Sequence, residues 1–258
     1  MKIAICLIAT NKYIKFFWDI ESQIYKYFLS NHDVFIYLFT NKNIKNKKRK
    51  NTTVKKINHE PWPMMTTKRF HFFNSIKEEL RSHDYIYYLD VDMKIVSNID
   101  NEVLGTLVAT KHPGYENTSS EHFPVCKNPN SKAYVENNKD LLHYYAGGFF
   151  GGKSYNFLEM ANILERNIEQ DLKNNSLPEW HDESHLNHYL KINPPEVTLN
   201  SNYCFDEKKI DLINKKNIKI IALDKDHDLY RNKFTYAKRL IAKTKLFLKR
   251  ILNAFRIL

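Results

Sequence analysis

The chain has 258 residues, 43% hydrophobic and 27% charged, which is the composition of a folded globular protein and excludes a disordered or collagen-like chain. No apolar run reaches the roughly 20 residues of a membrane-spanning helix. Three cysteines without a short spacing exclude a disulfide framework or zinc knuckle, so we expect a chain that works in a reducing cytoplasm.

Apolar, β-branched runs alternate with segments of helical periodicity, which predicts an α/β domain. We predict, in chain order, a strand at 3–9, a helix at 12–29, a strand at 34–39, a helix at 66–81, strands at 85–89 and 107–110, helices at 155–172 and 182–189, and a strand at 218–223. The Lys/Asn-rich segment 41–51 is expected to be an exposed loop. The turn-rich segment 111–138 is longer than an ordinary connection, and such loops usually carry function.

An acidic pair follows the strand predicted at 85–89. Asp90 and Asp92 are two residues apart, so in an extended chain both carboxylates point to the same side. Divalent cations take oxygen ligands and bridge to diphosphates, and open α/β sheets bind ligands beyond the carboxyl ends of their strands. The pair is therefore a candidate metal site, with ordinary strand-end carboxylates as the alternative.

Glycine is scarce in this chain, yet four of its six glycines fall within residues 147–152. Glycine lets a ligand or another backbone approach closely, which predicts a segment that lines a pocket beside the sheet. The alternative is a strand with bulged ends. The spacing does not match a G-x-G-x-x-G phosphate loop.

A second polar cluster opens the helix predicted at 182–189. Asp182 and Glu183 suit the positive end of a helix dipole, and capping is the alternative explanation. His181 and His185 are one turn apart, but the glutamate that either zinc-peptidase motif requires is absent from its position. A glutamate close to Trp180 suits sugar chemistry, where a carboxylate stabilises an oxocarbenium-like centre and an aromatic face packs on the ring.

The strings YYAGGFFGG (144–152) and WHDESHLNHYL (180–190), together with the acidic pair, resemble glycosyltransferase family 6, the family of the blood-group A and B transferases and the α-1,3-galactosyltransferases. The resemblance runs from about Ile3 to Arg231. It implies a GT-A fold, a Rossmann-like mixed sheet flanked by helices, in a catalytic domain of residues 1–233. It also implies a retaining transferase that moves galactose or N-acetylgalactosamine from its UDP derivative to the 3-hydroxyl of a β-galactoside, forming an α-1,3 linkage. Mn²⁺ is the implied cofactor, with Mg²⁺ as the alternative.

The resemblance also implies roles for single residues. Glu183 is the implied catalytic residue and the candidate nucleophile, while a front-face route in which the leaving diphosphate accepts the proton is equally compatible. The metal is implied at Asp90 and Asp92. The implied donor-binding residues are Ile8, Ala9, Thr10, Tyr13, Arg69, Asp90, Val91, Asp92, Ala146, Gly147, Gly148, Asp182, Lys225, His227 and Arg231. The implied acceptor-binding residues are His112, Trp180, Glu183 and Asp206.

Donor choice is read from the residues beside the glycine-rich strand. Gly148 matches a position that is glycine in the blood-group A enzyme and alanine in the B enzyme, which implies UDP-GalNAc as donor and UDP-Gal as the alternative. Ala146 departs from both enzymes. Pro124 stands where a threonine is common in the acceptor loop, so the second sugar of the acceptor, fucose or another, stays open.

Most of the net positive charge, and the membrane partner that it suggests, belong to the C-terminal segment. The net charge is +11, and from Phe234 onward seven basic residues and no acid alternate with apolar residues at helical spacing. We predict a basic amphipathic helix at 234–258 that binds an anionic membrane surface and suits a lipid-linked acceptor; packing on protein is the alternative.

Localisation and the competing function classes follow from these features. Anchor and stem segments are absent, so we expect a bacterial-type enzyme in the cytoplasm, peripheral on the inner membrane face at most. A nucleic-acid partner is not favoured, because no nucleic-acid-binding motif accompanies the basic residues. A non-catalytic sugar-nucleotide- or glycan-binding protein is the alternative of a different class.

Overall fold

The computed structural model describes residues 1–44, 51–212, 217–226 and 230, and it falls into two units, Met1–Asp224 and Lys225–Leu258. The predicted domain boundary after residue 233 and the predicted helix at 234–258 lie outside the described residues. So do the implied donor residues His227 and Arg231. All of these stay predictions.

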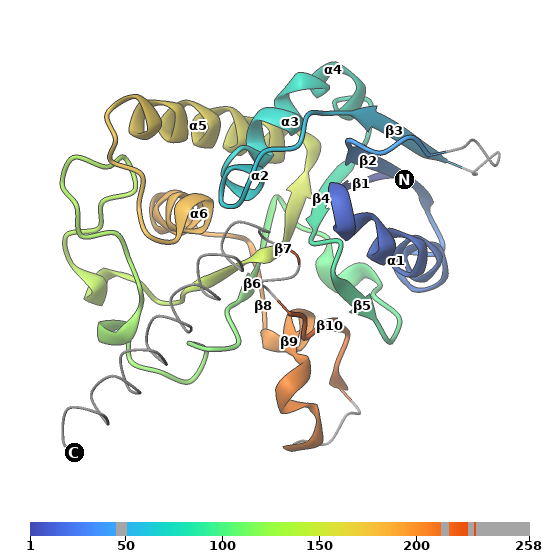
Figure 1. Cartoon of the computed structure of the whole chain (residues 1–258). Coiled ribbons are helices and arrows are strands. Elements are labelled where there is room, and N and C mark those ends of the chain that lie inside the picture. The colour runs from blue at the N-terminus through green and yellow to red at the C-terminus, as the bar shows by residue number, and fades with distance from the viewer. Residues whose placement is uncertain (45–50, 213–216, 227–229, 231–258) are drawn as a thin grey trace, which may run out of the picture. The chain divides into compact units, whose positions relative to one another are not determined.

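A seven-stranded sheet forms the centre of the first unit, in the order β3-β2-β1-β4-β7-β6-β8 (Figure 1). Neighbours among the first four are parallel, whereas β7 runs antiparallel to both β4 and β6. The predicted mixed α/β class is confirmed. The strands are β1 (Lys2–Ile8), β2 (Asp33–Thr40), β3 (Thr52–Lys56), β4 (Tyr85–Leu89), β6 (Leu107–Lys111), β7 (Tyr145–Lys153) and β8 (Val197–Leu199).

Helices cover both faces of the sheet, so its central strands are buried on two sides and read as continuous apolar runs. Helix α1 packs on one face and the remaining α-helices on the other (Figure 1). In β7, Phe149 points into the core under α1 and Phe150 into the core under α3 and α5. The helices are α1 (Ile14–Tyr27), α2 (Met64–Thr67), α3 (Arg69–Ser75), α4 (Lys77–Leu80), α5 (Ser154–Lys173) and α6 (His181–Ile192).

The prediction of a single helix at 66–81 is wrong. The backbone leaves helical dihedrals at Lys68 (ψ 11°) and at Ile76 (ψ 24°), which divides the segment into α2, α3 and α4. Phe70 and Phe73 of α3 and Leu80 of α4 still lie in one core cluster, so the apolar pattern persists through the break at Ile76 and does not report it.

A smaller sheet joins β5 (Met93–Ile95), β10 (Ile220–Ala222) and β9 (Phe205–Asp206), in the order β5-β10-β9. The strand predicted at 218–223 therefore exists but belongs to this sheet. Strand β5 follows the acidic pair directly, so the small sheet fixes the far side of that loop.

The segment between β6 and β7 is ordered by a hydrophobic cluster of its own, made of Phe123, Val135, Leu141 and Tyr144. It contains the short 3₁₀ turns η3 (Ser120–His122) and η4 (Asn138–Asp140).

The other 3₁₀ turns in the described residues are η1 (Asn11–Tyr13), η2 (Asn101–Val103), η5 (Ser201–Tyr203) and η6 (Glu207–Leu212).

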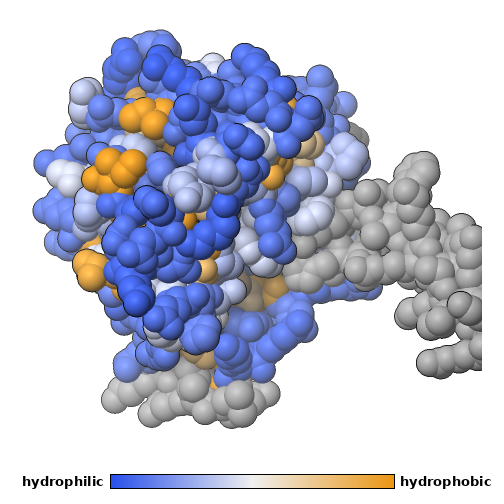
Figure 2. All heavy atoms as spheres, turned by 90° about the vertical axis from the view of Figure 1, so that its left-hand side faces the viewer, coloured by the Kyte–Doolittle hydropathy of each residue, from blue (hydrophilic) through white to orange (hydrophobic). Residues whose placement is uncertain are grey.

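Among the described residues, none of the helices has the length and apolar character needed to cross a bilayer. Figure 2, which faces the side that lies on the left in Figure 1, shows a largely hydrophilic surface with small, separate apolar spots. Scattered apolar side chains of this kind are ordinary on a protein surface.

Candidate active site

Four of the implied donor residues, Ile8, Ala9, Thr10 and Asp90, lie at one edge of the main sheet. Strands β1 and β4 are adjacent and parallel, so Ile8 at the end of β1 and Asp90 directly after β4 lie at the same edge. Ala9 is fully buried and donates its N–H to the carbonyl of Phe39 at 2.9 Å. Thr10 is also buried, and its hydroxyl is 2.9 Å from Nδ1 of His59, a contact that sequence reasoning missed.

The acidic loop is held from both sides. Asp90 donates its N–H to the carbonyl of Gly148 at 2.9 Å, and its Oδ1 accepts the hydroxyl of Tyr88. Asp92 is buried, and its carbonyl accepts the N–H of Leu223 at 3.1 Å. Backbone contacts on the two sides of the loop therefore hold the main chain that carries both carboxylates.

Arg69, the first residue of α3, is 4% exposed and links three parts of the site. Its Nη2 is 2.8 Å from Oδ2 of Asp182, its Nη1 donates to the carbonyl of Gly147, and its Cζ is 4.4 Å from the ring centroid of Tyr88. Burial lowers the pKa of Arg69, but the neighbouring acids, Asp182 first, outweigh it and raise that pKa. The guanidinium therefore stays charged between β7 and α6.

Glu183 lies in the first turn of α6 with both carboxylate oxygens fixed. Oε1 accepts the hydroxyl of Tyr144 at 3.0 Å and Oε2 accepts the N–H of Gly147 at 2.8 Å. Burial raises the pKa of Glu183 to about 7, although the two hydrogen bonds lower it. The carboxyl therefore titrates near neutral pH, as catalytic acids, bases and nucleophiles commonly do.

Asn187, one helical turn after Glu183, fixes α6 to β7. Its Oδ1 accepts the N–H of Tyr145 at 2.7 Å, and its Nδ2 donates to the carbonyls of Tyr145 and Glu183, each at 2.9 Å. Sequence reasoning missed Asn187 and Tyr144. The i, i+4 spacing from Glu183 was the available signal for Asn187, because such residues share a helix face.

The glycine-rich segment lies in the central strand β7, which agrees with the strand alternative, and its role in lining a pocket stays a prediction. A Cβ at Gly147 would lie 3.4 Å from Oε2 of Glu183, and a Cβ at Gly148 would lie 2.3 Å from Cε of Met93 and 3.4 Å from Oδ2 of Asp90. Gly147 of β7 therefore lies close to Glu183, and Gly148 lies close to Asp90. Larger side chains at these positions would occupy the space between the strand and the two carboxylates.

The acceptor residues implied by resemblance lie at several places. His112 follows β6, donates its N–H to the carbonyl of Tyr144 at 2.8 Å, and packs its ring against the ring of Tyr144. Burial lowers the pKa of His112 to about 4, so its ring is neutral at pH 7. Trp180 precedes α6 and is 48% exposed. Asp206 lies in β9, where its Oδ1 accepts the N–H of Lys208 at 3.1 Å.

The other implied donor residues are Ala146, buried in β7, Val91, buried between the two aspartates, and Tyr13, at the end of η1. Lys225 belongs to the second unit.

Of the two histidines in the α6 segment, His185 makes a buried contact with α5. Nε2 of His185 is 3.1 Å from Oδ2 of Asp171, and both side chains are fully buried. Asp171 also accepts the hydroxyl of Ser131 and the N–H of Lys132. This network connects the loop between β6 and β7 to α5 and α6. His185 therefore has a structural contact in place of the metal-binding role that a zinc-peptidase motif would give it.

Comparisons with known proteins agree with this geometry. The model of glycosyltransferase family 6 matches residues 1–232. Histo-blood group ABO system transferase 1 of Rattus norvegicus is 29% identical over 89% of this chain and 68% of its own length. O-antigen biosynthesis glycosyltransferase WbnI of Escherichia coli is 32% identical, over 88% of this chain and 97% of its own. Globoside alpha-1,3-N-acetylgalactosaminyltransferase 1 of Homo sapiens is 28% identical, over 90% and 69%.

Proposed function

Because the chain belongs to glycosyltransferase family 6 and is a hexosyltransferase, we propose that it moves N-acetylgalactosamine from UDP-GalNAc to the 3-hydroxyl of a β-galactoside, with retention and an α-1,3 linkage. UDP-Gal is the alternative donor. The names of several relatives, which are α-1,3-N-acetylgalactosaminyltransferases of globoside, support this choice. The family assignment favours catalysis over the non-catalytic sugar-binding alternative.

One observation carries the proposal. The Glu183 carboxylate is hydrogen-bonded on both oxygens and lies beside the buried Arg69–Asp182 ion pair, with the Asp90 loop against the same strand. Transfer of a sugar needs a negative group beside the anomeric carbon and a bound diphosphate that can leave. A fixed carboxylate next to a candidate metal site meets both needs.

The residues present fit a divalent cation. Asp90 and Asp92 offer the carboxylate oxygens that hard cations prefer, and Oδ2 of Asp90 stays available while Oδ1 accepts from Tyr88. We propose Mn²⁺ at these residues, with Mg²⁺ as the alternative. When bound, the ion would neutralise charge on the departing diphosphate.

Glu183 supports either of two routes to retention. As a nucleophile, an ionised carboxylate oxygen bonds to the anomeric carbon while the bond to UDP breaks; the acceptor oxygen then displaces Glu183 and gives its proton to the departed diphosphate. In the front-face route, the acceptor oxygen attacks from the side on which UDP leaves, the diphosphate takes the proton, and Glu183 stabilises the positive sugar. We propose that Asp182, which is held by Arg69, accepts hydrogen bonds from donor-sugar hydroxyls.

The donor choice rests on Gly148. The space beside its Cα is filled by the terminal methyl of Met93, an unbranched side chain that can withdraw and leave room for an acetamido group. An alanine at this position would place a methyl group in the same space.

The acceptor proposal has a membrane part. We propose a β-galactoside, with or without fucose, on a lipid carrier, approached from the cytoplasm, with residues 234–258 on an anionic membrane surface. Removing residues from Phe234 onward should abolish binding to anionic liposomes and leave transfer to a soluble acceptor intact. Unchanged liposome binding would disprove the membrane part alone.

The test of the whole proposal is UDP release from UDP-GalNAc and from UDP-Gal, each with β-galactoside and fucosylated β-galactoside acceptors, with Mn²⁺ and with chelator. We expect metal-dependent release, faster with UDP-GalNAc, that is lost in Asp92→Asn, and an α-1,3 linkage by NMR of the product. Faster transfer of galactose would overturn the donor choice.

A further inference from the structure

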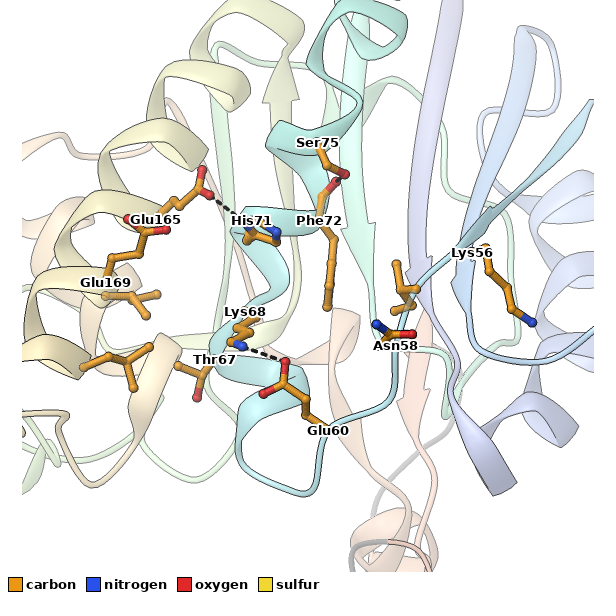
Figure 3. A pocket seen from close by; sticks show the side chains of 13 residues that line it. Lys56, Asn58, Glu60, Thr67, Lys68, His71, Phe72, Ser75, Glu165 and Glu169 are labelled. Atoms are coloured by element: carbon orange, nitrogen blue, oxygen red, sulfur yellow. Dashed lines mark hydrogen bonds and ion pairs between the residues drawn. The ribbon is translucent and has the colours of Figure 1, made fainter.

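A second group of metal-ligating side chains lies outside the site described above. His71 of α3 and Glu165 and Glu169 of α5 each offer one donor atom, and these atoms all lie within 4.8 Å of one another. Figure 3 shows the three side chains converging across the gap between the two helices. We call them the His71 cluster.

Each helix places its residues for a physical reason. Glu165 and Glu169 are one turn apart on the 20-residue α5 and therefore project from the same face. Nδ1 of His71 is 2.8 Å from Oε1 of Glu165 (Figure 3). Asn74 donates to the other oxygen of Glu165. Glu165 is thus oriented before an ion arrives, as metal ligands commonly are by hydrogen-bonding neighbours.

The charges of the cluster favour a cation. Two carboxylates at i, i+4 repel each other. In the part of the chain that the structure describes, the carboxylate of Glu169 has no hydrogen bond or ion pair with another residue. Lys68, which lines the same cavity, is 2.6 Å from Glu60 and so is already paired (Figure 3).

An ion has access to the cluster. The three residues line a cavity of about 450 Å³ between α3, α5 and the segment after β3, and the His71 side chain is 56% exposed. Arg69, two residues earlier on α3, is buried on the opposite side of that helix. The His71 cluster is therefore separate from the Asp90–Asp92 pair, although α3 contributes to both sites.

We propose that His71, Glu165 and Glu169 form a second cation site that binds Zn²⁺. One imidazole nitrogen with two carboxylates is a donor set that Zn²⁺ accepts, whereas Mg²⁺ and Ca²⁺ prefer oxygen ligands alone. With three protein ligands, the usual tetrahedral coordination of Zn²⁺ would leave a fourth position for a further ligand. A bound ion joins α3 to α5 and so stiffens the helix that carries Arg69.

Equilibrium dialysis of the full chain against Zn²⁺ tests the site, in an Asp90→Asn, Asp92→Asn background that weakens the acidic pair. His71→Ala and Glu169→Gln should each weaken Zn²⁺ binding at least about tenfold. Loss of a residue that only hydrogen-bonds to a metal ligand already weakens binding by about this factor, and loss of a ligand should weaken it at least as much. Glu159→Gln is the matched control, because Glu159 is an exposed glutamate of α5 outside the cluster. It should bind Zn²⁺ like the background.

Thermal unfolding gives a second readout, because a ligand that binds only the folded state raises Tm. Zn²⁺ should raise Tm of the background and of Glu159→Gln, but not of His71→Ala or Glu169→Gln, and Mg²⁺ should raise none through this site. The same variants in the otherwise unchanged chain should lose one bound Zn²⁺. If His71→Ala and Glu169→Gln bind Zn²⁺ as tightly as Glu159→Gln does, the proposal is wrong.

Discussion

The backbone N–H of Gly147 donates to Oε2 of Glu183 at 2.8 Å and so joins the glycine-rich strand to the first turn of α6. The two residues are 36 positions apart in the sequence. A Cβ at position 147 would meet Oε2 of Glu183 at 3.4 Å and Nη1 of Arg69 at 3.6 Å, which is ordinary van der Waals contact, so β7 approaches α6 and Arg69 closely at this position. The two segments that stand out in the sequence are therefore one site.

The pH dependence of transfer should follow Glu183. Either route needs its carboxylate ionised, and burial raises its pKa to about 7. We expect kcat/KM to rise between about pH 6 and pH 8, and Glu183→Gln to be at least about 100-fold slower without that rise. A profile of kcat/KM against pH for both forms is the measurement, and a flat profile for the unmodified enzyme would contradict this role.

The same shift has a consequence for stability. The folded-state pKa of Glu183 lies above its ordinary value of 4.5, so folding favours the protonated form. The contribution of Glu183 to the free energy of unfolding is therefore complete below pH 4.5, and it is lost as the pH rises through about 7. Urea unfolding at several pH values should show Glu183→Gln gaining stability relative to the parent as the pH rises; a constant difference would disprove the shift.

The hydroxyl of Tyr144 tunes this carboxyl. Its hydrogen bond to Oε1 lowers the pKa of Glu183, so Tyr144→Phe should move the rise in kcat/KM to higher pH. Tyr145→Phe is the control, since the hydroxyl of Tyr145 is 3.3 Å from that of Thr198. Equal pH profiles for the two variants would show that Tyr144 acts only by packing.

Removing Arg69 should destabilise the fold and the site together. Arg69→Ala leaves Asp182 buried without its ion-pair partner, which we expect to cost about 3 kcal/mol or more. Arg81→Ala is the control: Arg81 pairs with Glu78 at the surface and should cost less than about 1 kcal/mol. Urea unfolding measures both, and similar losses would mean that the buried pair contributes little.

Two glycines of β7 should respond differently to alanine. A Cβ at Gly148 meets the mobile end of Met93, so Gly148→Ala should fold and lower the preference for UDP-GalNAc over UDP-Gal about tenfold. A Cβ at Gly151 would lie 2.5 Å from the carbonyl oxygen of Ile86, which cannot withdraw, so Gly151→Ala should lose about 3 kcal/mol or more. Donor competition and urea unfolding test the two variants, and an unchanged donor ratio in Gly148→Ala would contradict the role of Gly148.

Much of the fold was accessible from the sequence because burial leaves a local pattern. Strands β1, β2 and β4 were predicted from apolar runs, since a strand covered by helices on both faces has few polar residues. The prediction that Asp90 and Asp92 share one side assumed an extended chain, whereas Val91 and Asp92 lie in a turn between β4 and β5, so the period of two does not apply to this pair. Strand β3 was missed because its polar residues at the sheet edge leave no such pattern.

The tertiary structure alone decided which of these segments meet. Nothing near Arg69 in the sequence indicates Asp182 as its partner, and Tyr144 and Asn187 acquire their contacts with Glu183 and β7 only because β7 lies beside α6. The break of the predicted helix at Lys68 is likewise seen only in the backbone dihedrals of the folded chain. Periodicity reports how deeply one segment is buried, whereas the contacts of a buried ion pair depend on strand order and helix packing between distant segments, which no local pattern encodes.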